Sequence, residues 1–288
     1  MCFAYYRYMN VEKEIFKNGS TTYYWSSKFF PKSIRDDVFK LYSFVRIVDD
    51  YVDAPEPDVK SFDHMVHRWN TAKEDLANHH QLDDSIAERV LRNIVYVVHR
   101  FDCDPGWVDA FLSSMQMDID KRQYKTLDDT LEYIYGSAEV IGLFMAQIMG
   151  LPEEARDFAK MQGRAMQFIN FIRDIDEDIT LGRRYFPTQD LKEFSLDNLS
   201  KKEAIAKPKE FKAFISKQTD RYELWQSEAA KGFDYIPRRL QIALKTAVDA
   251  YNWTGQEIAK NPMIIYEMQL KPSKRKMVKL GLKRKLKV

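Results

Sequence analysis

The chain contains the stretch Gln167-Phe168-Ile169-Asn170-Phe171-Ile172-Arg173-Asp174-Ile175-Asp176-Glu177-Asp178, in which polar side chains recur at helical spacing. A helix advances about 100° per residue, so residues three and four apart share one face. On such a helix Gln167, Asn170, Asp174 and Asp178 fall within roughly 90° of one another, and Asp176 falls on the far side. A row of oxygen ligands suits a hard cation such as Mg²⁺. For this motif alone, a solvated acidic face is the alternative.

A second row of the same kind lies in Tyr42-Ser43-Phe44-Val45-Arg46-Ile47-Val48-Asp49-Asp50-Tyr51-Val52-Asp53. Here Tyr42, Arg46, Asp49 and Asp53 share a face about 60° wide. Carboxylates that meet across a helical bundle repel one another unless cations lie between them. Arginine is suited to forked contacts with phosphate oxygens. The two rows together therefore predict a metal–diphosphate site.

The composition predicts a helical, globular protein. The 288 residues are 45% hydrophobic and 31% charged, with only 10 Gly and 10 Pro, and helix-forming residues are abundant. No stretch alternates as a strand would, and no linker divides the chain. We expect one all-α domain over residues 1–288, with 271–288 as a basic C-terminal tail. The longer helices are predicted near residues 34–52, 61–78, 84–100, 127–149, 152–180, 208–231 and 236–259.

Charge is distributed unevenly along the chain. Lys271 to Val288 contains nine Lys or Arg and no acid; because the total is +2, the remainder carries about −7. This balance argues against wide nucleic-acid binding. It leaves two alternatives for the tail, a solvated end or peripheral contact with an anionic membrane. Two cysteines, no signal-peptide pattern and no long apolar run favour a cytoplasmic protein, which we expect to be a monomer.

Beyond the two rows, Gly19-Ser20-Thr21-Thr22-Tyr23, Tyr135-Gly136, Gly142 and Arg184-Tyr185-Phe186-Pro187 occur in the order found in squalene and phytoene synthases. The chain resembles this family from about residue 19 to its last helix. The resemblance implies an isoprenoid-synthase-type helical bundle with a central cavity. It also implies a prenyltransferase that condenses two prenyl diphosphates head to head.

Residue roles follow from the resemblance, position by position. It implies catalytic roles for Asp49, Asp53, Asp174, Asp178, Tyr42 and Arg46, and metal binding by Asp49, Asp53, Asn170, Asp174 and Asp178. Contacts to the substrate are implied for Gly19, Ser20, Thr21, Thr22, Tyr42, Arg46, Gln167, Arg173 and Tyr251. The implied cofactor is Mg²⁺, with Mn²⁺ as a substitute, and NADPH is not expected.

The sequence favours phytoene, formed from two geranylgeranyl diphosphates through a cyclopropylcarbinyl diphosphate, as in carotenoid biosynthesis. The alternative is dehydrosqualene or squalene, formed from two farnesyl diphosphates. A non-catalytic isoprenoid-binding or assembly protein would have lost metal ligands, which are all present. A terpene cyclase would carry an Asn/Ser/Glu triad, which Asp174 and Asp178 do not match. The length of the prenyl chain depends on the floor of the cavity.

Several apolar residues are candidates for the cavity wall, with ordinary core packing as the alternative. They are Tyr23, Phe29, Tyr135, Leu143, Phe144, Met145, Phe168 and Phe171. Gly136, Ala138 and Gly142 either make room for a prenyl chain or allow close helix packing. Glu139 departs from the small or apolar residue that the family pattern predicts. The Arg that contacts phosphate near the C-terminus of relatives has no clear counterpart among Gln269, Lys274 and Arg275.

Overall fold

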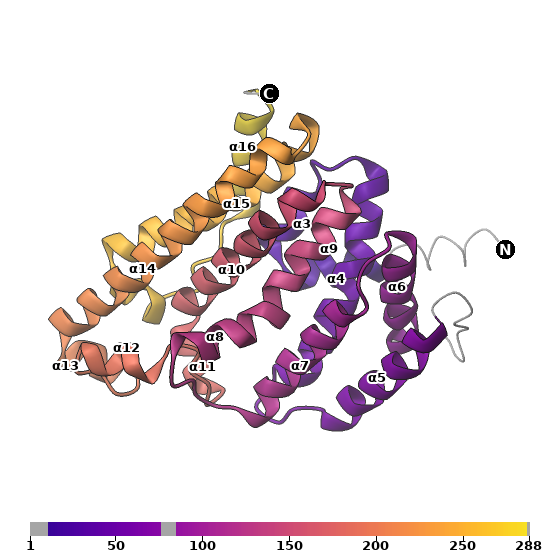
Figure 1. Cartoon of the computed structure of the whole chain (residues 1–288). Coiled ribbons are helices and arrows are strands. Elements are labelled where there is room, and N and C mark those ends of the chain that lie inside the picture. Colours follow the sequence, from indigo (N-terminus) through magenta and orange to yellow (C-terminus); the bar gives the residue numbers. More distant parts are fainter. Residues whose placement is uncertain (1–10, 76–84, 287–288) are drawn as a thin grey trace.

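The computed structural model describes residues 11–75 and 85–286, which form helices joined by short loops (Figure 1). The predicted all-α fold is confirmed, since the described residues contain no strand and only one isolated bridge, between Gln123 and Arg184. The α-helices are α2 (Val11–Gly19), α3 (Thr21–Ser27), α4 (Lys32–Val52), α5 (Val59–Ala72), α6 (Ile86–Arg100), α7 (Gly106–Asp120), α8 (Leu127–Ile134), α9 (Val140–Ile148), α10 (Arg156–Arg173), α11 (Ile175–Thr180), α12 (Thr188–Glu193), α13 (Lys201–Ala206), α14 (Pro208–Ala230), α15 (Arg238–Lys260) and α16 (Lys274–Lys285). The shorter segments are the 3₁₀ helices η1 (Lys73–Asp75), η3 (Glu153–Ala155), η4 (Lys231–Tyr235) and η5 (Pro262–Tyr266), and the π-helical η2 (Tyr135–Glu139).

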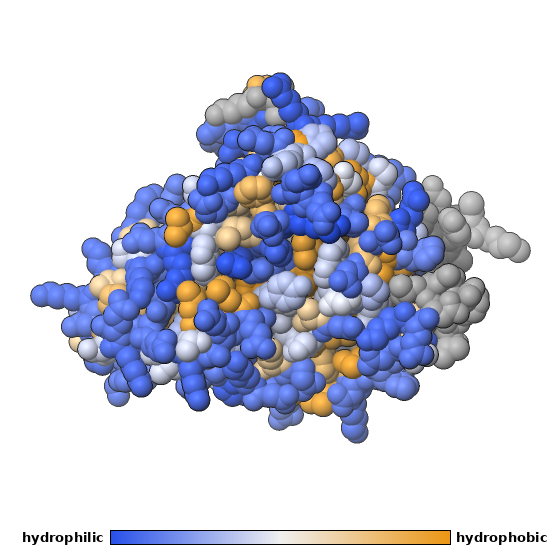
Figure 2. Space-filling view, viewed as in Figure 1, coloured by the Kyte–Doolittle hydropathy of each residue, from blue (hydrophilic) through white to orange (hydrophobic). Residues whose placement is uncertain are grey.

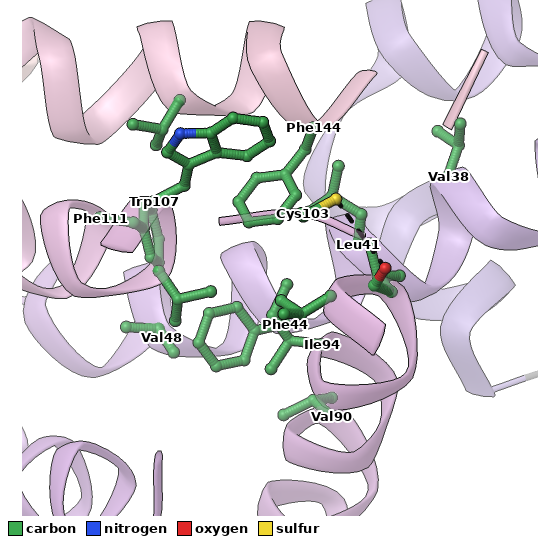
Figure 3. Close-up of a cluster of buried hydrophobic side chains, with 14 of the residues drawn as sticks. Val38, Leu41, Phe44, Val48, Val90, Ile94, Cys103, Trp107, Phe111 and Phe144 are labelled. Carbon is green, nitrogen blue, oxygen red and sulfur yellow. Dashed lines mark hydrogen bonds between the residues drawn. The ribbon is translucent and has the colours of Figure 1, made fainter. Parts of the chain in front are cut away.

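Helix α10 lies in the middle of the bundle, packed against α9, α14 and α15 (Figure 1). Helix α4 packs against α2, α6 and α7. One group of buried apolar side chains fills the space among α2 to α7 and α9, and a second fills the space around α10 to α15. Figure 3 shows part of the first group, where Trp107 and Phe144 meet edge to face with ring centroids 5.2 Å apart. Phe44 and Phe111 lie beside them, 5.9 Å apart.

On the face shown in Figure 2 the surface is mostly hydrophilic, and apolar residues appear as scattered patches. Among the described helices, none is long and apolar enough to cross a membrane. Local sequence explains where several helices begin. Ser20, Ser85 and Ser273 each accept a hydrogen bond from the backbone N–H three residues later, which satisfies an amide that has no partner within the helix.

Two predicted helices differ from the structure. The helix expected over residues 152–180 is interrupted at Asp174, whose φ of −100° and ψ of 15° end α10 before α11 begins. Its backbone N–H still donates to the Asn170 carbonyl oxygen at 2.8 Å, and the Asp178 N–H donates to the Asp174 carbonyl oxygen at 2.8 Å. The three side chains therefore remain one turn apart. The helix expected over 127–149 contains the π-helical η2, and the end of the helix expected over 61–78 lies partly outside the described residues.

Candidate active site

A cavity of about 320 Å³ lies between α4 and α10, and part of each row lines it, whereas Asp53, Asp174 and Asp178 are not among its lining residues. Tyr42, Arg46 and Asp49 line it from α4, and Gln167 and Asn170 line it from α10. These polar side chains come from the C-terminal halves of the two helices. The rest of the wall is mainly apolar and includes Phe16, Phe30, Met115, Met145, Met149, Phe158, Met166, Phe233 and Ile236.

On the α4 side, Arg46 donates from Nη1 to Asp49 Oδ2 at 3.2 Å and also pairs with Asp50. Burial, followed by the neighbouring Asp53 carboxylate, raises the pKa of Asp49 to about 7. Gly19 lies directly against this row: a Cβ added to it would lie 2.6 Å from the Tyr42 hydroxyl oxygen. A side chain at position 19 would therefore have to displace the ends of Tyr42 and Arg46, where the end of α2 approaches α4.

On the α10 side, Arg173 donates from Nε to Asp174 Oδ1 at 2.7 Å. Asn170 Oδ1 is buried and accepts no hydrogen bond from the described residues. Burial raises the pKa of Asp178, and the carboxylates of Asp174 and Asp53 raise it further. Asp53 directly follows α4 as its C-cap and Asp178 lies on α11, so the two rows do lie close enough for their charges to interact.

Tyr251, on α15, lies behind this side of the cavity. Its ring centroid is 5.8 Å from that of Tyr23. Burial raises the pKa of Tyr251, and the nearby positive charge of Arg173 opposes this shift. Tyr251 is thus placed beside the cation expected to contact phosphate. Ser20 caps α3, Thr22 is buried, and Thr21 occupies the first position of α3.

The oxygen ligands fit a hard cation in kind, although they are not assembled into a cage. Among residues 11–75 and 85–286, no group of three or more His, Cys, Asp or Glu is close enough to hold a metal ion. The site offers instead two carboxylates, Asp49 and Asp178, whose pKa values are raised by burial and then by repulsion from neighbouring carboxylates. It also offers the unpartnered oxygen of Asn170. A divalent cation that keeps some of its water is satisfied by one or two carboxylates together with substrate phosphates.

Sequence reasoning missed a buried network beneath the two rows. Asp118, on α7, is 3% exposed and accepts hydrogen bonds from the hydroxyls of Tyr133 at 2.7 Å and Tyr185 at 2.6 Å. Arg183 is also 3% exposed; its Nη1 donates to Asp53 Oδ1 at 2.8 Å. Burial raises the pKa of Asp118 to about 6, against the favourable charge of Arg183.

A signal for Asp118 was present in the sequence. It lies three residues after Met115, which is buried on α7 together with Phe111, so an acid falls on an otherwise apolar helix face. Such an acid needs a buried partner. The run Arg184-Tyr185-Phe186-Pro187 was recognised only as a family motif, and the charge of the preceding Arg183 was not matched to Asp118 or Asp53.

The predictions for the cavity wall were right for Tyr23, Met145, Ala138 and Gly142 and wrong for most of the aromatic candidates. Phe144, Phe168, Phe171 and Leu143 are core residues. Tyr135 is 41% exposed, and Phe29 packs against Gly281 of α16. All except Phe29 lie on predicted helices, but helical spacing alone does not tell which apolar face meets a cavity and which meets another helix.

The structure also clarifies the positions of Glu139, Asp176 and Gly136. Glu139 is buried and accepts a hydrogen bond from Arg164 Nε at 2.6 Å, so its charge is paired. Asp176 is exposed, as predicted. A Cβ on Gly136 would lie 2.1 Å from the Ala110 carbonyl oxygen, so this glycine serves close helix packing.

The chain is similar in sequence to proteins of one known family. Residues 16–280 match the family model described as "Squalene/phytoene synthase". The chain is 31% identical over 251 residues to the 15-cis-phytoene synthase of Enterobacter agglomerans, covering 84% of this chain and 83% of the relative. It is 28% identical over 272 residues to the 15-cis-phytoene synthase of Paracoccus sp., covering 93% and 87%.

Solved structures share the fold at lower identity. A dehydrosqualene synthase in complex with ligand matches with a TM-score of 0.76 at 20% identity, covering 99% of this chain and 97% of that one. The squalene synthase HpnC from Alicyclobacillus acidocaldarius matches with a TM-score of 0.74 at 22% identity, covering 88% and 93%. From the family match across most of its length, the chain belongs to the squalene/phytoene synthase family of prenyltransferases.

Proposed function

We propose that the protein condenses two geranylgeranyl diphosphates head to head into phytoene, through a cyclopropylcarbinyl diphosphate and with Mg²⁺. The observation that carries this proposal is the cavity itself. Arg46 and Asp49 from α4 and the amides of Gln167 and Asn170 from α10 line part of it, and the rest of the wall is mainly apolar. An elongated apolar wall with a few polar groups suits a substrate made of a hydrocarbon chain and a charged head.

The arginines have a clear part in the proposed reaction. Arg46 and Arg173 now pair with carboxylates of their own rows, Asp49 and Asp174. A diphosphate entering with metal ions would compete for both guanidiniums, because phosphate accepts the same forked hydrogen bonds as carboxylate. Both arginines would then hold the leaving group while the allylic C–O bond breaks. Asp49, Asp53, Asn170, Asp174 and Asp178 would hold Mg²⁺, which when bound stabilises the charge of the departing diphosphate.

The apolar wall would keep water away from the carbocation that remains after ionisation. The carbocation can then react in two ways: the second prenyl chain attacks it, or water captures it to give an alcohol. Tyr23 and Tyr42 contribute hydroxyls near the polar part of the wall. Burial holds the pKa values of both phenols above their ordinary value, so they remain neutral hydrogen-bond donors at ordinary pH.

The extent of the cavity lining along α10 supports a twenty-carbon chain. Phe158 and Asn170 both line it from α10, and twelve residues of helix span about 18 Å. Sixteen main-chain carbons in an extended chain span about 19 Å, and the twelve of a farnesyl chain about 14 Å, from C–C bonds of about 1.5 Å. The proposal therefore prefers geranylgeranyl to farnesyl diphosphate. We also propose that the enzyme is a cytoplasmic monomer and that it needs no NADPH.

The test is to incubate the purified protein with Mg²⁺ and either prenyl diphosphate, without NADPH, and to identify the hydrocarbon by chromatography and mass spectrometry. We expect phytoene from geranylgeranyl diphosphate. Dehydrosqualene from farnesyl diphosphate as the sole hydrocarbon would move the chain to the alternative reaction. Formation of alcohols alone from both substrates would refute the synthase proposal.

A further inference from the structure

The basic C-terminal segment is a packed helix, contrary to the expectation of a solvated end. On the inner side of α16, Met277 is fully buried, and Gly281 sits so close to Phe29 that an added Cβ would lie 2.0 Å from the ring. Arg284 donates from Nε to Asp249 Oδ2 on α15 at 2.6 Å. Helix α16 is therefore fixed on α3 and α15, at the top of Figure 1.

Part of the positive charge of α16 serves this packing. Lys274 places Nζ 4.6 Å from the centre of the Trp25 ring, and Lys276 places Nζ 3.3 Å from that of Trp253. Such cation–π contacts join the two lysines to α3 and α15. With Arg284, three basic residues thus contribute to holding the helix in place.

The outer side of α16 combines exposed apolar side chains with cations. Val278, Leu282 and Leu286 are 37%, 52% and 88% exposed and recur every four residues, which places them in a stripe about 80° wide. Lys279 and Lys283 follow one edge of the stripe. A shallow groove on this side is lined by Lys274, Arg275, Val278, Lys279, Leu282, Lys283 and Leu286. We name the set Arg275, Val278, Lys279, Leu282, Lys283 and Leu286 the outer face of α16.

We propose that the outer face of α16 docks on the surface of an anionic lipid bilayer. The face offers cations for lipid phosphates and, between them, apolar side chains for the boundary with the acyl chains. No acidic residue occurs from Lys271 to Val288, while the rest of the chain is net acidic, so this segment concentrates positive charge that a negative surface attracts. A nucleic acid would satisfy the cations but would leave the three apolar side chains in water.

The position of α16 connects this surface to the cavity. Phe29, which packs against Gly281, is followed by Phe30, and Phe30 lines the cavity with Ser26 and Ser27. The docking helix thus covers the segment that forms one wall of the cavity. If the proposed function holds, this arrangement places the site of an oil-soluble product beside the phase that dissolves it. The docking itself does not depend on the reaction.

Vesicle cosedimentation without substrate tests the proposal. The wild-type protein should sediment with vesicles that contain phosphatidylglycerol and remain in solution with phosphatidylcholine alone. The double variant Lys279→Glu/Lys283→Glu should lower the partition coefficient at least about tenfold, because each cation near an anionic surface contributes roughly a factor of five. Leu282→Glu should also lower it, and all these side chains are exposed, so the helical spectrum should be unchanged.

Matched controls lie on α14, whose first turns meet α13, away from α16 (Figure 1). Lys209→Glu/Lys212→Glu makes the same charge change at exposed positions, and Leu224→Glu replaces a leucine that is 61% exposed. Both should bind vesicles like the wild type. Equal loss in controls and α16 variants, or no loss in either, would overturn the proposal. So would binding of the wild type to a DNA oligonucleotide without binding to vesicles. A failed product assay would leave this result untouched.

Discussion

Replacing Arg183 by Met should destabilise the protein because it removes the positive charge between two carboxylates. Arg183 is 3% exposed and donates to Asp53 Oδ1 and to the Val52 carbonyl oxygen. Its charge also favours the ionised form of Asp118, which is itself 3% exposed. The methionine leaves Asp118 without its cation and the Val52 carbonyl oxygen without that donor.

The size of the effect follows from burial. Removing one partner of a buried ion pair costs about 3–5 kcal/mol. The side chain of Asp53 is 40% exposed, so water replaces part of what it loses, and the lower figure of about 3 kcal/mol applies. For a chain of this size we expect the melting temperature to fall by roughly 6–12 °C.

Thermal and urea unfolding, followed by circular dichroism, measure this change. The loss should shrink as the pH falls from about 8 to about 5. Burial already raises the pKa of Asp118 to about 6, and losing Arg183 raises it further, so the penalty exists only where Asp118 is ionised. Adding Asp118→Asn to Arg183→Met should restore part of the stability, as a double-mutant cycle would show. A loss below about 1 kcal/mol, or one that is equal at both pH values, would refute the network.

Three further predictions concern the site and its packing. Mg²⁺ should raise the melting temperature more at about pH 8 than at about pH 5. The folded pKa of Asp49 is raised to about 7, so without metal the fold gains stability on acidification and loses it as pH rises through 7. An equal rise in melting temperature at both pH values would contradict this. Gly19→Ala should raise KM for the diphosphate, since its Cβ would push the Tyr42 hydroxyl aside; unchanged kinetics would count against that contact. Gly136→Ala should lower the free energy of unfolding, measured by urea titration, by at least about 2 kcal/mol. Its Cβ would meet the rigid Ala110 carbonyl. An unfolding midpoint equal to that of the wild type would show that the helices separate easily.

The sequence predicted the two polar faces because they depend only on helical spacing within single elements. Asp49 and Asn170 line one cavity, as expected from that spacing, and Asp176 points to solvent. The break at Asp174 could not be predicted in this way. The residue still fits a helical pattern, and its departure shows only in the backbone angles.

Features that depend on contacts between distant elements were missed. Asp118, Tyr133 and Tyr185 meet across separations of 15 and 67 residues, which no local pattern encodes. The same limit explains why the basic tail was expected to be solvated. Its composition is that of a solvated end, but Met277 and Gly281 match the surface that α3 and α15 happen to present. The π-helical η2 likewise follows from packing against α7 and α10.

The central claim is that the α4 and α10 rows act together on a prenyl diphosphate with Mg²⁺. Release of diphosphate from geranylgeranyl diphosphate, measured with and without Mg²⁺, tests it most directly in Asp49→Asn, Asp174→Asn and the exposed control Asp176→Asn. We predict Mg²⁺-dependent release in the wild type and in Asp176→Asn, and near loss of release in the other two, with unchanged helical spectra. Release that persists in Asp49→Asn and Asp174→Asn, or that needs no Mg²⁺, would contradict the claim.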